Sequence, residues 1–191
     1  MSWLILVAGY LVGALPTAYI AGRWQRGLDI RQLGDGNMGA RNAYYQLGHR
    51  TGVTIFIVDV LKGSAPVLLA QSLGLPQGFV LAAGLATVIG HNWPVFIHFR
   101  GGRGEATTIG VFLALLTQPM LIVAGPALAT LLLRRNVIAA SCVLFVPLPL
   151  ICWWLGLTPL LIGYSVALPV LVGLTHYQRT RQVSGASAGA T

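Results

Sequence analysis

The residues best suited to chemistry lie in a glycine-rich stretch between two apolar segments, GGRGEATTIG at 101–110. Glycine-rich backbone that leads into a helix offers amide groups and a positive dipole end to an anion. Arg103 and Thr107 add a charge and a hydroxyl group at the same place. The stretch lacks the G-x-x-x-x-G-K-[ST] pattern of nucleoside triphosphate hydrolases. We therefore expect it to bind a single phosphate group.

A second glycine-rich loop follows the first apolar segment, where residues 34–39 match the pattern G-x-G-x-x-G. The match is weak as a dinucleotide fingerprint, because no strand precedes it and no βαβ unit is available. Arg41 and Asn42 follow the glycines directly. The loop is either a flexible interfacial segment or a second phosphate-binding loop, and the sequence leaves both interpretations open.

Ionisable residues also lie inside apolar segments, where they are costly and mark function by default. Asp59 and Lys62 are three residues apart, so they share one helix face and can pair. His91 precedes Asn92 in a further segment. The structural alternatives are an ion pair that fixes helix packing and a core histidine satisfied by the backbone. Asp59 and His91 lie at a similar depth, about 12 Å from the cytoplasmic end of each helix, which predicts a shared vestibule.

The elements that must position these residues are membrane-spanning helices. The chain is 55% hydrophobic and 8% charged, whereas a soluble domain has about 25% charged residues. A span needs about 20 apolar residues. The 106–133 run can form one long helix or two short ones, and Pro119 in the first turn of a second helix favours a break at 117–119. The apolar runs cover about 3–22, 53–73, 78–98, 106–133, 136–155 and 158–176.

The distribution of arginines predicts the topology. With a break at 117–119 the chain has seven spans, and every loop arginine falls on one side, which the positive-inside rule makes cytoplasmic. We expect an all-α, polytopic membrane protein with its N-terminus outside and its C-terminus in the cytoplasm. Residues 1–183 would form one domain and 184–191 a disordered tail. The net charge of +8 then reflects membrane topology and not binding of nucleic acid.

Several motifs resemble one known family over nearly the whole chain. GALPTAYIAGR, LDIRQLGDGNMGARN, DVLKG, GHNWPVF and GGRGEATTIG stand in the order and at the spacing of the bacterial acyl-phosphate:glycerol-3-phosphate acyltransferases, the PlsY family. The resemblance implies a multi-pass protein of the bacterial cytoplasmic membrane, with its active site facing the cytoplasm. Its substrates would be acyl phosphate and glycerol 3-phosphate, and its products lysophosphatidic acid and phosphate. Membrane lipid would be its other partner.

The resemblance also implies direct transfer, in which a substrate phosphate helps to take the proton. The sequence shows no convincing nucleophile set of the Ser-His-Asp or Cys-His kind, and we expect no metal and no cofactor. The candidate catalytic residues are His91, Asn37 and Arg103. The candidate residues for binding the substrate phosphates are Gly36, Arg41, Asn42, Lys62, Gly101, Gly102, Gly104, Thr107, Ser141 and His176.

The chain departs from the family pattern at several of these motifs. Asp35 stands for a serine, Arg41 for a threonine and Arg103 for a lysine; Tyr45, Glu105 and Arg179 also differ from the family residues. We expect Arg41 to pair with Asp35 and so to offset its charge. The alternatives to an acyltransferase are a paralogue with another substrate, a non-catalytic protein that binds lipid or a partner, and a transporter. The sequence leaves the oligomeric state open.

Overall fold

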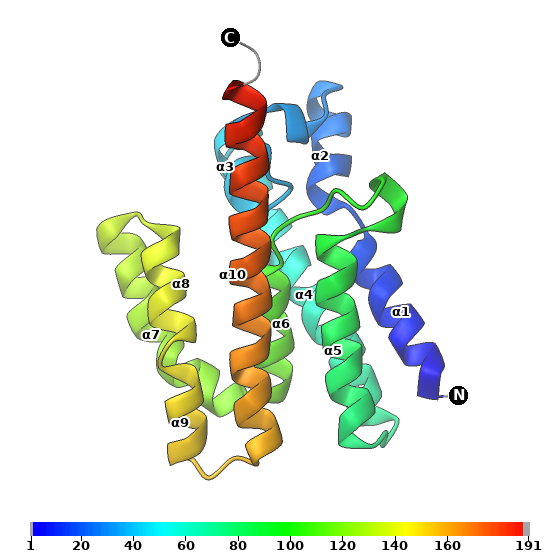
Figure 1. Cartoon of the computed structure of the whole chain (residues 1–191), viewed down its shortest axis with the longest axis vertical. Helices are drawn as coiled ribbons and strands as arrows, with labels where there is room; N and C mark the ends of the chain where they lie inside the picture. The colour runs from blue at the N-terminus through cyan, green and yellow to red at the C-terminus, as the bar shows by residue number, and fades with distance from the viewer. Residues whose placement is uncertain (1, 189–191) are drawn as a thin grey trace. The chain divides into compact units, whose positions relative to one another are not determined.

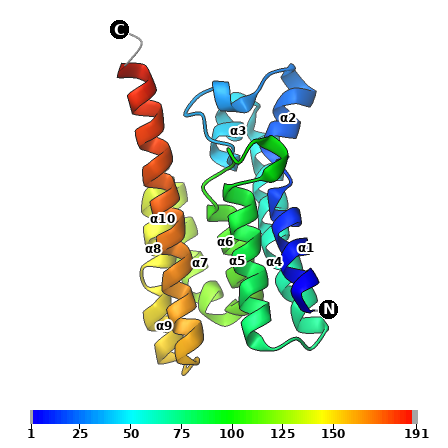
Figure 2. The same ribbon diagram turned by 45° about the vertical axis from the view of Figure 1, so that its right-hand side comes forward.

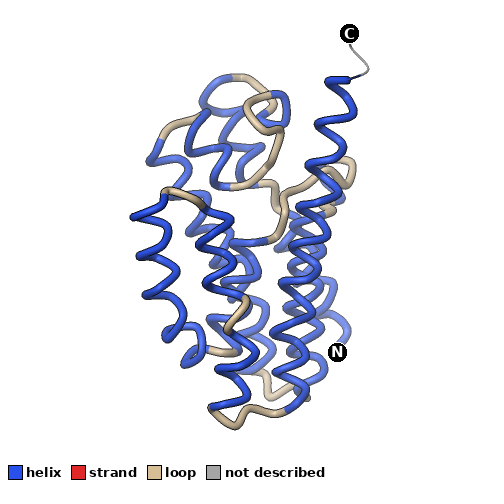
Figure 3. The backbone as a smooth tube through the Cα atoms, turned by 60° about the vertical axis from the view of Figure 1, so that its left-hand side comes forward, coloured by secondary structure: helices blue, strands red, loops and turns tan. Residues whose placement is uncertain are grey.

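The computed structural model describes the backbone of residues 2–188 and the side chains of residues 2–181. Every element assigned in these residues is helical (Figure 3), which confirms the all-α prediction. Two short 3₁₀ helices, η1 and η2, lie in the connections. The elements are α1 (Ser2–Ala14), α2 (Thr17–Arg26), η1 (Ile30–Gln32), α3 (Ala40–Gln46), α4 (His49–Ser72), α5 (Gln77–Asn92), η2 (Val95–Ile97), α6 (Glu105–Leu115), α7 (Thr117–Arg134), α8 (Val137–Phe145), α9 (Leu148–Trp154) and α10 (Pro159–Ala188).

Six helical segments of the described chain are long and apolar enough to cross a membrane. Helix α6 is apolar but has only 11 residues, a rise of about 16 Å. The prediction of a multi-pass membrane protein is therefore confirmed at the level of helix length and composition. The six segments are Ser2–Arg26, His49–Ser72, Gln77–Ile97, Thr117–Arg134, Val137–Trp154 and Pro159–Arg181.

Two helix breaks lie beside prolines, which lack a backbone N–H donor. The predicted break in the 106–133 run is confirmed, since α6 ends at Leu115 and α7 begins at Thr117. A second break, which the sequence analysis did not anticipate, lies in the first span. There α1 ends at Ala14 and α2 begins at Thr17, after Pro16. This break leaves main-chain carbonyls of the first span without helical partners, inside a protein that has to satisfy them.

The chain divides into two compact units, each described here by itself. The first comprises residues up to Val111 together with those from Val172 onward, and the second comprises Phe112–Leu171. Within the second unit α7 packs against α8, and the Phe112 ring meets the edges of Phe145 and Tyr164. Almost all of the candidate site residues belong to the first unit.

Glycines allow helices of the first unit to touch at backbone distance, as small residues do between membrane helices. Helix α1 runs beside α5 (Figures 1 and 2). A methyl group on Gly13 would overlap the carbonyl oxygen of Thr87, and one on Gly90 would overlap that of Tyr10. On the other side of the unit, Gly63 of α4 approaches the Thr107 carbonyl of α6 in the same way.

Changing Gly90 to alanine should destabilise the first unit by about 1–3 kcal/mol, the usual effect of overpacking. The added methyl group has to separate α1 from α5, because its obstacle is the Tyr10 backbone and not a mobile side chain. Gly78→Ala is the matched control, since Gly78 lies in the same helix with open space at its Cβ position. The measurement is the thermal unfolding midpoint in detergent. Equal midpoints for the two variants would contradict the close α1–α5 contact.

Candidate active site

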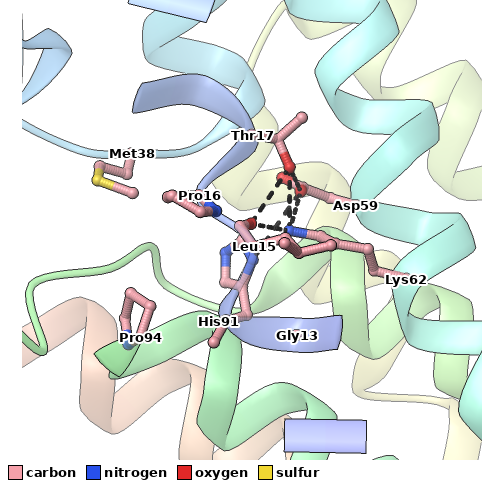
Figure 4. A pocket seen from close by; sticks show the side chains of 10 residues that line it. Gly13, Leu15, Pro16, Thr17, Met38, Asp59, Lys62, His91 and Pro94 are labelled. Carbon is pink, nitrogen blue, oxygen red and sulfur yellow. Dashed lines mark hydrogen bonds and ion pairs between the residues drawn. The ribbon is translucent and has the colours of Figure 1, made fainter. Parts of the chain in front are cut away.

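The break in the first span is held together by a half-buried threonine of α2 and two buried charged side chains of α4 (Figure 4). Lys62 Nζ donates to the Leu15 carbonyl oxygen at 2.8 Å and to Thr17 Oγ1 at 3.1 Å, and it lies 2.8 Å from Asp59 Oδ1. Thr17 Oγ1 in turn donates to Asp59 Oδ1 at 3.1 Å. We call Thr17, Asp59, Lys62 and the Leu15 carbonyl the helix-break cluster. The ion pair that the sequence spacing permitted is present.

The helix-break cluster uses the whole hydrogen-bonding capacity of the lysine. An ammonium group has three N–H donors, and Lys62 has three acceptors inside the protein. The side chains of Lys62 and Asp59 are only 6% and 2% exposed. Lys62 therefore serves first to bind the Leu15 carbonyl at the break, which also accepts the Thr17 amide at 3.0 Å, and its predicted contact with a substrate phosphate stays a prediction.

His91 lies against the helix-break cluster at the end of α5. Its side chain is buried, and Nδ1 is 4.0 Å from Asp59 Oδ1, which is too long for a hydrogen bond. The two residues line one small pocket, as their matching depth in the spans predicted. The pocket residues are Gly13, Ala14, Leu15, Pro16, Thr17, Met38, Asp59, Lys62, His91 and Pro94 (Figure 4).

The glycine-rich loop before α6 rests on this histidine. The amide of Gly101 donates to the Asn92 carbonyl at 3.2 Å, and that of Gly102 donates to the His91 carbonyl at 3.1 Å. A methyl group on Gly102 would overlap His91 Nε2. The sequence-based expectation that the amides of this loop are free is therefore wrong for Gly101 and Gly102, because they cap the last turn of α5. The loop leads directly into α6, which begins at Glu105.

Arg103 points from this loop to the other glycine-rich loop. Its Nη1 lies 3.4 Å from Asp35 Oδ2, with the arginine side chain 14% exposed and the aspartate side chain 41% exposed. Asp35 Oδ1 accepts a hydrogen bond from the Asn37 amide at 3.1 Å. The expectation that Asp35 would pair with Arg41 is wrong, because the two loops approach each other and give its carboxylate to Arg103.

Further charged side chains gather around this ion pair. His176 of α10 lies within electrostatic range of Arg103, Asp35 and Arg41, and Arg179 lies within range of Arg103. We call these five residues the Arg103 cluster. Sequence analysis had proposed Arg41, Arg103 and His176 as site residues from three separate segments, and the structure brings them together. Within the cluster, Asp35 is the single acid.

Helix α10 also fixes the loop that carries Arg103. Arg179 Nη2 donates to the carbonyl oxygens of Asn92 and Phe99 at 3.1 and 3.3 Å. The Asn92 side chain donates to Thr175 Oγ1 at 3.2 Å, and it contacts Gly104, whose φ of 83° favours glycine. The arginine that departs from the family pattern at 179 therefore ties α10 to the end of α5 and to the middle of this loop.

The buried side-chain amide of Asn42 orders the loop that carries Asp35. Asn42 Nδ2 donates to the carbonyl oxygens of Ile30, Leu33 and Asn37 at 3.3, 2.9 and 2.9 Å. These contacts describe a folded turn and not a flexible interfacial segment. Gly36 adopts a φ of 66° in this turn, which explains the glycine. Asn42 thus shapes the loop, and its predicted contact with phosphate stays a prediction.

Arg31 forms a salt bridge within its own connection and a hydrogen bond to the connection that follows α5. Arg31 binds the Asp29 carboxylate with Nε and Nη2, at 2.6 Å for the shortest contact, and donates from Nη1 to the Ile97 carbonyl at 3.2 Å. The hydrogen bonds from Arg31 hold the pKa of Asp29 below its usual value. Asp29 therefore remains ionised at neutral pH and keeps Arg31 in place between the two connections.

The remaining predicted residues are Thr107 of α6 and Ser141 of α8. The Thr107 side chain is fully buried at the start of α6, and its hydroxyl has no hydrogen-bond partner among the described residues. Ser141 belongs to α8 in the second unit, where its hydroxyl donates to the Val137 carbonyl at 2.8 Å. Their roles stay predictions. Sequence analysis missed Thr17, although a hydroxyl residue directly after Pro16 is a usable signal for a broken span with free carbonyls.

Comparison with known proteins agrees with this arrangement. The family model described as glycerol-3-phosphate acyltransferase matches residues 3–185. Glycerol-3-phosphate acyltransferase 4 of Dehalococcoides mccartyi is 50% identical over 182 residues, which are 95% of this chain and 98% of the relative. A glycerol-3-phosphate acyltransferase of Prochlorococcus marinus is 41% identical over 90% of this chain and 84% of its own.

The fold matches solved structures as well. Crystal structures of PlsY, an integral membrane glycerol 3-phosphate acyltransferase, in its glycerol 3-phosphate and lysophosphatidic acid forms, superpose with a TM-score of 0.83 at 29% identity. The match covers 97% of this chain and 92% of each PlsY chain. With the family model, the curated relatives and the fold in agreement, the chain belongs to the glycerol-3-phosphate acyltransferase family.

Proposed function

We propose that the protein transfers a fatty acyl group from acyl phosphate to the sn-1 hydroxyl of glycerol 3-phosphate and releases lysophosphatidic acid and inorganic phosphate. Family membership over residues 3–185 supports the reaction class. The bound forms in which PlsY is described support glycerol 3-phosphate as the acceptor. The observation in this chain that carries the proposal is the Arg103 cluster, which gathers cations from α3, the loop before α6 and α10.

The reaction requires little covalent chemistry from the protein. The sn-1 oxygen attacks the acyl carbonyl carbon and forms the ester bond, while the bond between that carbon and the phosphate oxygen breaks. The hydroxyl proton passes to a phosphate oxygen, so no protein nucleophile is required. The protein has to align two anionic substrates and stabilise the developing charge. In this proposal Arg103, Arg41 and His176 bind phosphate, with Asn37 beside them.

The helix-break cluster has a supporting role in this proposal. Lys62 and Asp59 hold α4 to the broken first span, and His91 carries the Gly101–Gly102 backbone that positions Arg103. His91 is therefore proposed to act through the loop, unless a substrate reaches its ring. Ser141 and Thr107 are kept as candidate phosphate contacts from the family resemblance alone.

We also propose a seven-span topology with the N-terminus outside, the C-terminus in the cytoplasm and residues 1–183 as one functional domain in the bacterial cytoplasmic membrane. Counting α6 as a crossing puts the loop arginines on one side, as the positive-inside rule requires. The acyl chain of the donor would then lie in the membrane, with both phosphates at the cytoplasmic boundary. Residues 189–191 of the expected disordered tail lie outside the described residues.

The experiment that tests the function is turnover by the purified protein in lipid mesophase, given palmitoyl phosphate and glycerol 3-phosphate. Phosphate release and lysophosphatidic acid formation should rise together, in equal amounts. His91→Ala should abolish both, because it removes the buried imidazole against which Gly102 of the Arg103 loop packs. His49→Ala is the matched control, since His49 is exposed and stacks on Tyr44 away from the Arg103 cluster. No turnover by a folded wild-type protein, beside an active relative, would contradict the proposal.

A further inference from the structure

Asp35 occupies a position that a phosphate group has to share. Its Oδ2 faces Arg103 Nη1 at 3.4 Å, and its Oδ1 accepts the Asn37 amide at 3.1 Å. Both carboxylate oxygens thus have partners within the protein. A phosphate bound by Arg103 would meet a like charge about 4 Å away, which is unfavourable even in water.

Arg103 has N–H donors available for a second anion. Its guanidinium offers five donors in a planar fork that suits phosphate. The Arg103 Nε atom is buried and has no hydrogen-bond partner among the described residues. The side chain is held on a loop whose glycine amides are bonded to the end of α5, so Arg103 is the fixed member of the pair.

The aspartate is placed to move. Its side chain is 41% exposed, so the carboxylate can rotate toward solvent while the turn that carries it stays folded. At 3.4 Å the ion pair is also longer than the usual contact between a charged nitrogen and a carboxylate. A long, half-exposed pair is a weak one, so exchange of its carboxylate for another anion costs little.

We propose that Asp35 is a displaceable counter-anion of Arg103, which the phosphate of an incoming substrate replaces and which returns when a phosphate-bearing product leaves. Asp35 then sets the affinity of the site for phosphate and keeps the empty Arg103 cluster from binding free phosphate tightly. The proposal rests on the proposed function in one respect, that substrate phosphate binds at Arg103. It extends that function by assigning a role to a residue that departs from the family serine.

The test compares two changes at this position that separate charge from shape. Asp35→Asn keeps the size of the side chain and an acceptor for the Asn37 amide but removes the charge. Asp35→Glu keeps the charge. The probe is inorganic phosphate, and its dissociation constant is measured by calorimetry on the purified full-length protein. We expect about tenfold tighter binding in Asp35→Asn and nearly wild-type binding in Asp35→Glu. In turnover, the KM for glycerol 3-phosphate should fall in Asp35→Asn, without a rise in kcat.

Each outcome decides one question. If Asp35→Asn binds phosphate no tighter than the wild type, if both variants bind it more tightly, or if no form binds it, the counter-anion proposal is overturned. If Asp35→Asn alone binds phosphate more tightly while the wild type shows no acyl transfer, the counter-anion role stands and the acyltransferase function fails. Because phosphate binding needs no turnover, the two failures are distinguishable.

Discussion

Replacing Arg103 by methionine should lower kcat/KM for glycerol 3-phosphate by about a hundredfold or more, the loss expected when the bound phosphate loses a charged hydrogen-bond partner. Arg103 is the least exposed member of the ion pair with Asp35, and its loop is fixed to α5 and α10. The phosphate would lose a preorganised guanidinium and keep the repulsion of Asp35. Most of the loss should therefore appear in KM, as expected for an interaction that the bound substrate already makes.

Two further variants make the Arg103 prediction specific. Arg103→Lys restores the lysine of the family pattern but offers a point charge in place of a planar fork, so it should recover part of the activity. Arg100→Met removes a charge from the same loop at an exposed position and should change kcat/KM much less. The measurement is steady-state phosphate release at varied glycerol 3-phosphate. Equal losses for Arg103→Met and Arg100→Met would mean that the loop acts only through its overall charge.

The sequence predicted the helical framework because apolar runs of span length and the proline at 119 carry that information locally. It also singled out both glycine-rich loops as candidate phosphate-binding loops, although it left the 34–39 loop open between that role and a flexible segment. It did not predict which charges pair. Asp35 and Arg103 are far apart in sequence, and their contact depends on how two loops fold. Arg41 is nearer to Asp35 along the chain, yet the fold places the carboxylate beside Arg103.

A second limit concerns main-chain atoms. The three partners of Lys62 include the Leu15 carbonyl, which no side-chain pattern reveals. The local signal is Pro16, which interrupts the helix, followed directly by the hydroxyl residue Thr17. The same limit explains the Gly101 and Gly102 amides, which seemed free for an anion but are bonded to the end of α5. In both places a main-chain carbonyl accepts a hydrogen bond from a group that the sequence analysis had assigned to binding the substrate.

The helix-break cluster gives the second large effect. Lys62→Met should destabilise the protein by about 3–5 kcal/mol, because it leaves the buried Asp59 carboxylate without its counter-charge and removes one of the two donors to the Leu15 carbonyl. Adding Asp59→Asn should recover most of the loss, since the double variant buries no unpaired charge. The measurement is the unfolding midpoint of wild type, both single variants and the double variant in one detergent.

Activity of that double variant separates two roles of Lys62. If Lys62 only satisfies the broken first span, Asp59→Asn with Lys62→Met should fold and retain much of the turnover, because the Arg103 cluster is intact. If Lys62 leaves its three acceptors to bind a substrate phosphate, as the family resemblance implied, the double variant should fold and fail to turn over. The geometry favours the first result, because a phosphate would have to compete with a carboxylate, a hydroxyl and a carbonyl that already surround a 6% exposed ammonium group.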